Sequence, residues 1–360
     1  MNSFHPMHSR TAPSPRSGNR RSLCRGLLTA AVLAGCAWGA SALASSAPPP
    51  STDSAALLAS AGPLLQPAQL NALMRAGAPL HIIDLRGAKA YAKGHLPGAL
   101  SAPYPAWRGP GYNPGRLLTV AGFTRLVRSL GLHQDDHVVL VSAGGNPTDF
   151  GAPARVFWTL KWLGMSHLSI LNGGMQAWHA AGLAGLQQGA QPAVSASDFE
   201  PHLDNSLLAT REQVLHRVDD PRASDLLLDA RPKNFWEGKV KAPAAVVPGT
   251  IPGALDFSNM RWFPHGGGAL PPLSVLQAIA RNLPPQQAQA KQTISFCNTG
   301  HWAAIDWFAL SEVLGEKIVR LYPGSMVDWT QSAVALPMDN VPGRAKQLLV
   351  DAKLWAAKHL

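Results

Sequence analysis

Short apolar runs alternate with segments of helical period along most of the chain. The apolar runs at residues 81–85, 138–141 and 168–171 are rich in Ile, Val and Leu and have the length of buried strands. Residues 67–75 begin with proline and are closely followed by glycine, which is the usual punctuation of a helix. Strands that alternate with helices at this spacing indicate a parallel sheet with helices on both faces. The sequence therefore predicts an α/β fold.

The second half of the chain repeats the motifs of the first half in the same order. An Asp-x-Arg sequence ends an apolar run at Asp84 and at Asp229, a Pro-Gly-Ala turn occurs at Pro97 and Pro252, and a Met-x-x-Trp segment occurs at Met175 and Met326. Repetition of this kind indicates a duplicated domain. We therefore expect two tandem domains, each a parallel sheet with helices on both faces.

The motifs and the composition place the predicted boundaries. They give a signal peptide at residues 1–44, a flexible leader at 45–63, a first domain at 64–185, a linker at 186–205, a second domain at 206–340 and a helical tail at 341–360. Residues 233–247 are longer than their counterpart in the first domain. They are a candidate substrate-side loop, although a tolerated surface insertion is the more common explanation.

The amino-terminal 44 residues have the pattern of an export signal. Five arginines with no acidic residue precede an apolar run at 26–35 and then small residues. The pair Arg20-Arg21 resembles a twin-arginine signal, and cleavage after Ala44 fits ordinary signal peptidase. Cys36 follows a lipobox-like sequence and is the lipid-anchored alternative. A periplasmic protein is expected. The apolar run is too diluted by Gly, Ser and Ala for a transmembrane helix, and no other segment is a candidate span, so none is expected in the mature chain.

Half of the net charge of +10 lies in that signal. The remaining residues hold 26 basic and 21 acidic side chains, a weak excess that does not favour nucleic-acid binding.

Cys297 is the cysteine that remains after cleavage at Ala44, since Cys24 and Cys36 are removed with the signal. A lone thiol in an oxidising compartment has no intramolecular disulfide partner. Cys297 stands between an apolar run at 293–296 and a helical pattern at 302–314, where loop N–H groups and a helix amino terminus converge on the sulfur. That environment stabilises a thiolate nucleophile. The alternative is a buried structural cysteine.

The corresponding loop of the first repeat, residues 142–147, contains no cysteine. These motifs, in this order in both halves, resemble those of the rhodanese family of sulfurtransferases in its two-domain form. The resemblance runs from about residue 64 to about residue 336. It implies an inactive first domain, a catalytic second domain, and no metal or organic cofactor.

The resemblance also implies a mechanism and its partners. Cys297 attacks the sulfane sulfur of a small-molecule donor such as thiosulfate or 3-mercaptopyruvate and becomes a persulfide, from which a thiol or cyanide takes the sulfur. A protein sulfur acceptor is a further possible partner. The residues expected to hold the donor or persulfide, through loop N–H groups or side chains, are Arg231, Asn298, Thr299, Gly300, His301, Trp302 and Ala303.

Some of these assignments have structural alternatives. Arg231 matches the family arginine that binds the anionic end of the donor. Alternatively, it forms an ion pair with Asp229 and hydrogen bonds with loop carbonyls. His301 orients donor or acceptor, or faces solvent as a loop histidine. Trp302 forms the floor of the pocket, or simply packs against its neighbours.

The loop after the cysteine departs from the two common patterns of the family. Thiosulfate-type members carry cations at the two positions occupied here by Asn298 and Thr299. Mercaptopyruvate-type members have a Gly-Val-Thr continuation where this chain has Gly300, His301 and Trp302. The loop sequence therefore does not identify the sulfur donor. Cations elsewhere in the second domain that would compensate for the missing charge are Arg231, Lys239 and Lys241.

Two other functions compete with sulfur transfer. Related phosphatases need an arginine at the end of this loop, where Ala303 and Ala304 stand. A non-catalytic periplasmic sulfur carrier or persulfide-binding module is the more serious alternative. A third interpretation, in which both domains are relics that bind a partner, predicts that no donor modifies Cys297.

Overall fold

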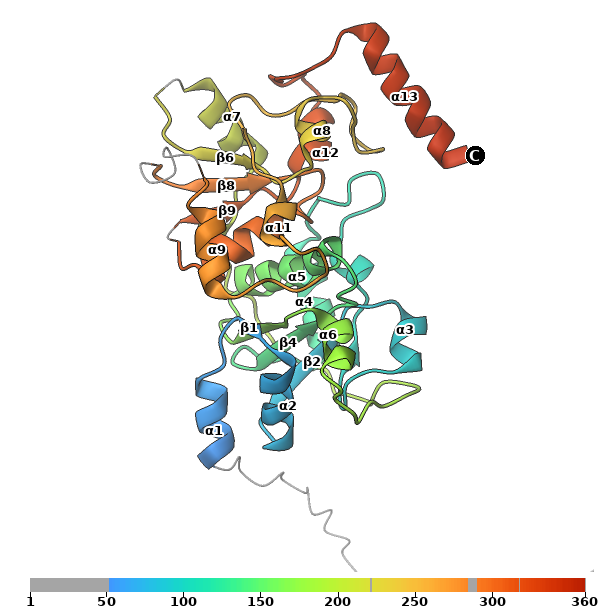
Figure 1. Cartoon of the computed structure of the whole chain (residues 1–360), viewed down its shortest axis with the longest axis vertical. Helices are drawn as coiled ribbons and strands as arrows, with labels where there is room; N and C mark the ends of the chain where they lie inside the picture. The colour runs from blue at the N-terminus through green and yellow to red at the C-terminus, as the bar shows by residue number, and fades with distance from the viewer. Residues whose placement is uncertain (1–51, 221, 284–289, 317, 360) are drawn as a thin grey trace, which may run out of the picture. The chain divides into compact units, whose positions relative to one another are not determined.

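The computed structural model describes residues 52–220, 222–283, 290–316 and 318–359. The expected signal peptide, its cleavage site and Cys36 lie outside the described residues. Each repeat forms one parallel sheet, and helices α5 (Gly151–Trp162) and α11 (Ala303–Trp307) lie between the two sheets (Figure 1). The α/β fold of two parallel-sheet units predicted from the sequence is confirmed.

The sheet of the first repeat has the strand order β1-β5-β4-β2-β3. The strands are β1 (Leu64–Leu65), β2 (Leu80–Asp84), β3 (Leu100–Ser101), β4 (His137–Val141) and β5 (Leu168–Leu171). The helices and 3-10 turns of this repeat are α2 (Pro67–Arg75), α3 (Ala88–Lys93), η1 (Tyr104–Trp107), α4 (Val120–Ser129), η2 (Pro147–Phe150), α5 (Gly151–Trp162) and α6 (Gly174–Ala180). Strand β4 is buried at all five positions, because helices cover both of its faces.

The sheet of the second repeat has the order β7-β6-β8-β9. Its strands are β6 (Leu226–Asp229), β7 (Leu255–Asp256), β8 (Thr293–Phe296) and β9 (Val319–Leu321), and η3 (Asn205–Leu207) precedes them. Its other elements are α7 (Arg211–Asp219), α8 (Lys233–Trp236), η4 (Asn259–Trp262), α9 (Leu273–Ala280), α11 (Ala303–Trp307), the π-helical turn η5 (Phe308–Val313), α12 (Ser325–Thr330) and α13 (Arg344–His359). Strand β8 lies between β6 and β9, with Asp229 paired to Phe296.

The local signals in the sequence account for several element ends. Helix α2 has the predicted bounds, and the Thr119 hydroxyl accepts the Gly122 N–H at the start of α4. Two stretches differ from expectation. Residues 52–59, expected in a flexible leader, form helix α1 (Thr52–Ala59), whose Ala- and Leu-rich sequence has high helix propensity. The helix expected from 302 to 314 is α-helical only to Trp307 and continues as the π-helical η5.

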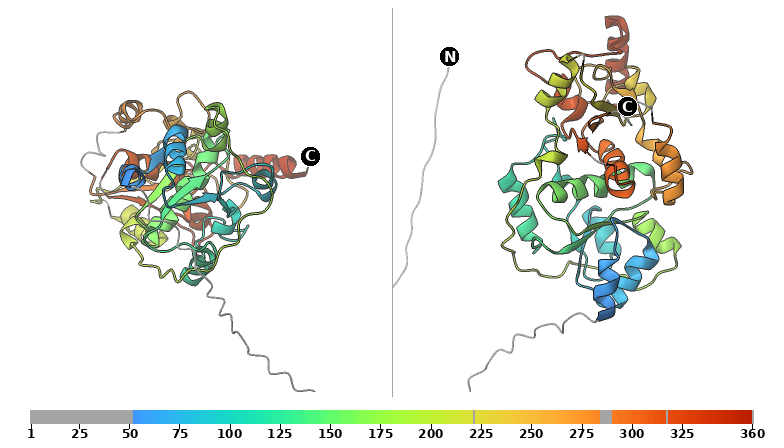
Figure 2. Two further views of the ribbon diagram at one scale, coloured as in Figure 1. Left: turned by 90° about the horizontal axis from the view of Figure 1, so that it is seen from below. Right: turned by 90° about the vertical axis from the view of Figure 1, so that its left-hand side faces the viewer.

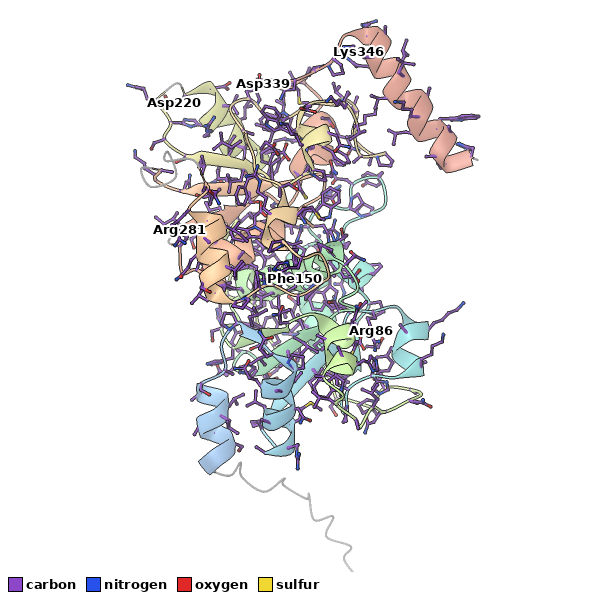
Figure 3. The ribbon with its side chains drawn as sticks, in the orientation of Figure 1. Arg86, Phe150, Asp220, Arg281, Asp339 and Lys346 are labelled. Carbon is purple, nitrogen blue, oxygen red and sulfur yellow. The ribbon has the colours of Figure 1, made fainter. Side chains whose placement is uncertain are left out.

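The two repeats share one apolar core along α5 and α11. Phe157 of α5 packs edge-on against Phe308, with ring centroids 5.1 Å apart, and Phe150 packs against the same ring at 5.6 Å. Figure 2 shows the two helices side by side from another direction, and Phe150 is labelled between the two sheets in Figure 3. This shared core brings first-repeat side chains to the loop that follows β8.

No helix in the described ranges is long and apolar enough to cross a membrane.

Candidate active site

Cys297 is the first residue after β8, at the carboxyl end of a central strand of the second sheet. Its side chain is a free thiol that is buried, with 1% of the residue exposed. The chain then passes through Asn298, Thr299, Gly300 and His301, and α11 begins one residue after Trp302. The predicted strand, loop and helix are therefore present, and the amino-terminal end of α11 follows the loop directly.

Ser325, at the start of α12, fixes the two ends of the cysteine loop. Its hydroxyl oxygen accepts the N–H of Cys297 and the N–H of Gly300, both at 3.0 Å, and the hydroxyl donates to the Tyr322 carbonyl at 2.8 Å. The Cys297 carbonyl accepts the Met326 N–H at 3.0 Å. Because the Gly300 N–H is bonded to Ser325, it is not directed at a sulfur ligand. Ser325 directly precedes the Met-x-x-Trp segment of the second repeat, and no motif in the sequence indicates its contact with the cysteine loop.

The backbone of Ser325 has φ +55°, in the left-handed region that disfavours residues with a Cβ. The equivalent residue of the first repeat is Gly174, with φ +53°. The serine hydroxyl makes three hydrogen bonds that a glycine lacks, and these offset the backbone strain. The replacement of Gly174 by Ser325 between repeats was the sequence signal that distinguished the two loops.

Two arginines of the first repeat reach the cysteine loop. Arg108 Nη2 donates to the Thr299 carbonyl at 2.9 Å, and Arg155 Nη1 donates to the same oxygen at 3.3 Å. Arg155, on α5, also donates to the Gly115 carbonyl at 3.3 Å and is 1% exposed. Gly300 has φ +70°, and a Cβ there would lie 2.2 Å from Arg155 Nη1, so the contact requires glycine. The Thr299 backbone is thus held by the other repeat.

His301 belongs to a hydrogen-bonded chain that also crosses between the repeats. Its Nε2 lies 2.9 Å from the Thr148 carbonyl, which can only accept, so Nε2 carries the proton. Its Nδ1, 3.0 Å from the Tyr104 hydroxyl, then accepts from that hydroxyl, which in turn accepts from Arg108 Nη1 at 2.6 Å. Burial lowers the pKa of His301 to about 3, and nearby Arg108 acts in the same direction. His301 is therefore neutral near pH 7 and partly covered.

The cations named from the sequence are all paired with carboxylates. Arg231 is 2% exposed, donates through Nε and Nη2 to Asp229, and donates through Nη2 to the Gly249 carbonyl. Lys239 Nζ lies 2.6 Å from Glu237, and Lys241 Nζ lies 2.8 Å from Asp351 of α13. These contacts of Arg231 match the alternative in which it is tied to Asp229 and to a loop carbonyl. Its role in donor binding stays a prediction.

By contrast, neither Arg108 nor Arg155 pairs with a carboxylate within the described part of the chain. Burial lowers the pKa of Arg155 to about 9, neighbouring Arg108 adds to the effect, and Tyr104 and Cys297 oppose it. A guanidinium with this pKa is still charged near pH 7. Two cations of the first repeat therefore contact the cysteine loop directly. The cations expected at the site from the sequence all belong to the second repeat.

An aromatic side chain of α8 packs against Trp302 of the loop. Trp302 packs edge-on against Phe235 of α8 at 5.9 Å between centroids, and the Arg231 guanidinium lies 5.7 Å from the Phe235 ring centre. The Trp302 Nε1 donor and the Asn298 Oδ1 acceptor are buried without a hydrogen-bond partner among the described residues. The loop thus presents one donor and one acceptor that a small polar ligand can satisfy. Ala303 is fully buried at the start of α11.

Ser142 occupies the position of Cys297 in the first repeat. It directly follows β4, and its carbonyl accepts the Met175 N–H at 2.9 Å, as the Cys297 carbonyl accepts that of Met326. A cavity of about 410 Å³ beside it is lined in part by Ser142, Tyr104 and His301. The first repeat therefore keeps the backbone of the site without the thiol.

Comparisons with known proteins agree with this architecture. The family model described as rhodanese-like domain matches residues 66–181 and 210–332. A probable 3-mercaptopyruvate sulfurtransferase of Pseudomonas aeruginosa is 34% identical over 258 residues, which cover 68% of this chain and 84% of that protein. The thiosulfate sulfurtransferase of Bos taurus is 30% identical over 258 residues, covering 68% of this chain and 80% of that protein.

A solved structure gives the same result in three dimensions. The 3-mercaptopyruvate sulfotransferase from Escherichia coli has a TM-score of 0.61 and 26% identity, with 74% of this chain and 99% of that chain covered. The chain belongs to the rhodanese family, with two tandem rhodanese-like domains. Within that family it is a sulfurtransferase, and its substrates are accordingly a sulfur donor and a sulfur acceptor.

Proposed function

We propose that this sulfurtransferase moves sulfane sulfur from a small anionic donor to a thiol or cyanide through a persulfide on Cys297. The observation that carries the proposal is the position of Cys297, at the carboxyl end of β8 and directly before the loop that leads into α11. The equivalent position of the first repeat holds Ser142. The second repeat therefore contains the sulfur nucleophile.

The transfer takes place in two displacements. With thiosulfate as donor, the Cys297 thiolate attacks the outer sulfur, the donor S–S bond breaks, and sulfite leaves with the electron pair. An acceptor thiolate or cyanide then attacks the outer sulfur of the persulfide, and Cys297 leaves as the thiolate. Each step exchanges one bond to sulfur for another, so neither step needs an external oxidant or reductant.

Positive charge from the first repeat supports an anionic donor. The loop lacks side-chain cations at Asn298 and Thr299, and Arg231 is already paired with Asp229. Arg108 and Arg155 bring two guanidinium groups to the Thr299 carbonyl, next to the start of α11. These charges and the helix amino terminus favour an anion at Cys297 over a neutral group.

The burial of Cys297 sets a condition on the donor. Cys297 is buried, with 1% of the residue exposed, so little space is open beside the thiol. Small donors are therefore favoured over bulky ones. The unpartnered Trp302 Nε1 and Asn298 Oδ1 are the polar atoms available to a donor that enters.

A donor panel tests the proposal. The protein is incubated with thiosulfate or with 3-mercaptopyruvate, and mass spectrometry measures the gain of one sulfur atom on the peptide that contains Cys297. We expect modification with at least one donor, turnover when cyanide or a thiol is added, and neither in Cys297→Ser. A wild-type protein that no donor modifies would refute the persulfide and favour the relic interpretation.

A dedicated sulfur carrier is the second candidate, favoured by the uncharged Asn298 and Thr299. A carrier receives its sulfur from a protein partner. Wild-type turnover of thiosulfate and cyanide no faster than that of Cys297→Ser, together with persulfide on Cys297, would identify a carrier rather than a turnover enzyme.

We further propose that the protein is exported to the periplasm and cleaved after Ala44, on the sequence pattern of residues 1–44. Cell fractionation and amino-terminal sequencing of the processed protein test this. A chain that begins with a lipidated Cys36 would instead establish the anchored form.

A further inference from the structure

Helix α13 attaches to the second repeat by one side only. Val350 is 8% exposed, and Asp351 pairs with Lys241 at 2.8 Å. In Figure 1 the rest of the helix extends away from the sheets, and Figure 3 labels Lys346 near its beginning. The helix therefore presents a long face that no described residue covers.

The uncovered face of α13 is apolar. With 3.6 residues per turn, positions 345, 348, 349, 352, 355 and 356 share one side of the helix, opposite Val350. His359, at the carboxyl end of the same side, stacks on Trp355 with ring centroids 4.8 Å apart. Leu348, Leu349 and Trp355 on this side are 69%, 61% and 63% exposed. We call this surface the α13 stripe, and its members are Ala345, Leu348, Leu349, Ala352, Trp355 and Ala356. Three large apolar side chains on one exposed helix face mark an interaction surface.

Basic residues border the α13 stripe on both sides. Arg344 lies along one margin, Lys346 and Lys353 lie along the other, and all three are exposed. The one acidic residue of the helix, Asp351, forms an ion pair with Lys241. The surface is therefore apolar at its centre and cationic at its margins.

We propose that the α13 stripe docks this protein on a membrane surface of anionic phospholipid. A helix with this arrangement lies in the plane of the membrane interface, with Leu and Trp side chains between the headgroups and the acyl chains. Lys346 and Lys353 extend to the phosphate groups on one side of the helix, and Arg344 extends to those on the other side. A second copy of the chain fits less well, because the cationic margins of two stripes repel each other.

This proposal goes beyond sulfur transfer and does not depend on it. The stripe lies on α13, and none of its residues belongs to the cysteine loop or to the side chains that contact that loop. Docking would localise the sulfurtransferase at a membrane surface without a spanning helix.

Vesicle sedimentation tests the proposal. The chain that begins at Ser45 retains the compact unit of residues 49–360 and lacks the apolar amino-terminal run. It is mixed at low salt with vesicles of phosphatidylcholine alone or of equal phosphatidylglycerol and phosphatidylcholine. We expect at least about tenfold more protein bound to the anionic vesicles, with binding lost at high salt.

Two double variants separate the apolar and the charged contributions. Leu348→Ser with Trp355→Ser, and separately Lys346→Gln with Lys353→Gln, should each weaken binding about tenfold. The matched controls are Val334→Ser, which removes another exposed apolar side chain, and Lys89→Gln with Lys93→Gln on α3, and both should bind as wild type. Circular dichroism checks that each variant is folded.

Three results would overturn the proposal. They are absence of wild-type binding to anionic vesicles, equal binding by the stripe variants and their controls, and a wild-type dimer in sedimentation equilibrium that the stripe variants dissociate. The last result would assign the stripe to self-association.

Discussion

The Nδ1 atom of His301 lies 3.0 Å from the hydroxyl oxygen of Tyr104, and this hydrogen bond joins the cysteine loop to the first repeat. Arg108 extends the connection, since it donates to both the Tyr104 hydroxyl and the Thr299 carbonyl. Two residues of the loop are thus held by one group of first-repeat side chains. The repeat without the thiol therefore takes part in forming the site.

Tyr104→Phe tests this connection. The variant removes the hydroxyl that donates to His301 and accepts from Arg108, so we expect the free energy of unfolding to fall by about 1 kcal/mol. We also expect slower persulfide formation on Cys297, because the loop is held less firmly. Urea unfolding and donor-dependent mass spectrometry measure the two effects. Tyr112→Phe, at a 63% exposed tyrosine, is the matched control, and an equal effect there would contradict the interpretation.

Two variants at Ser325 distinguish the effect of backbone strain from the effect of the hydrogen bonds on stability. Ser325→Gly relieves the left-handed strain but removes the three hydrogen bonds, whereas Ser325→Ala removes the bonds and keeps the strain. We expect Ser325→Ala to be less stable than Ser325→Gly by about 1 kcal/mol. Both should slow sulfur transfer, since the Cys297 and Gly300 N–H groups lose their acceptor. Full activity in both variants would show that the loop keeps its shape without Ser325.

Substitutions of Arg155 test whether the positive charge on α5 promotes persulfide formation at Cys297. Arg155→Met removes a buried cation and its bonds to the Thr299 and Gly115 carbonyls, so we expect persulfide formation from an anionic donor to fall about tenfold. Arg155→Lys, which keeps the charge, should recover part of the rate. Single-turnover kinetics measure it, with the exposed Arg125→Met as control. A loss in Arg155→Lys as large as in Arg155→Met would show that geometry, not charge, matters.

His301 makes the stability of the protein depend on pH. Its pKa is about 3 in the folded chain, below its ordinary value of 6.5, so the unfolded chain binds more protons between these values. The stability due to neutral His301 is complete above pH 6.5 and is lost as the pH falls toward 3. We expect the urea midpoint to decrease over this window, and less steeply in His301→Gln. An unaltered slope in His301→Gln would refute the assignment.

The sequence predicted the fold because its signals are local. Apolar runs, a capping threonine and duplicated turns each act within a few residues, and the positions of the strands and most helices follow from them. The contacts at the site are not local. Arg155 and Thr299 are 144 residues apart in sequence, and no periodicity or motif indicates that they meet. The pairing of Arg231 with Asp229, two residues away, was visible in the sequence and was considered there as an alternative.

The difference between Ser325 and Gly174 limits how the first repeat can be re-engineered. A cysteine placed at Ser142 would follow β4 as Cys297 follows β8, but Gly174 has no hydroxyl to hold the loop behind it. A serine at Gly174 would place its Cβ 2.3 Å from the Ser142 carbonyl oxygen. Two point substitutions would therefore not be enough to create a second sulfur-transfer centre, because the Ser142 carbonyl lies too close to Gly174 to leave room for a serine side chain. Reversing the loss of the thiol would require a shift of the main chain around Gly174 as well as a change of side chains.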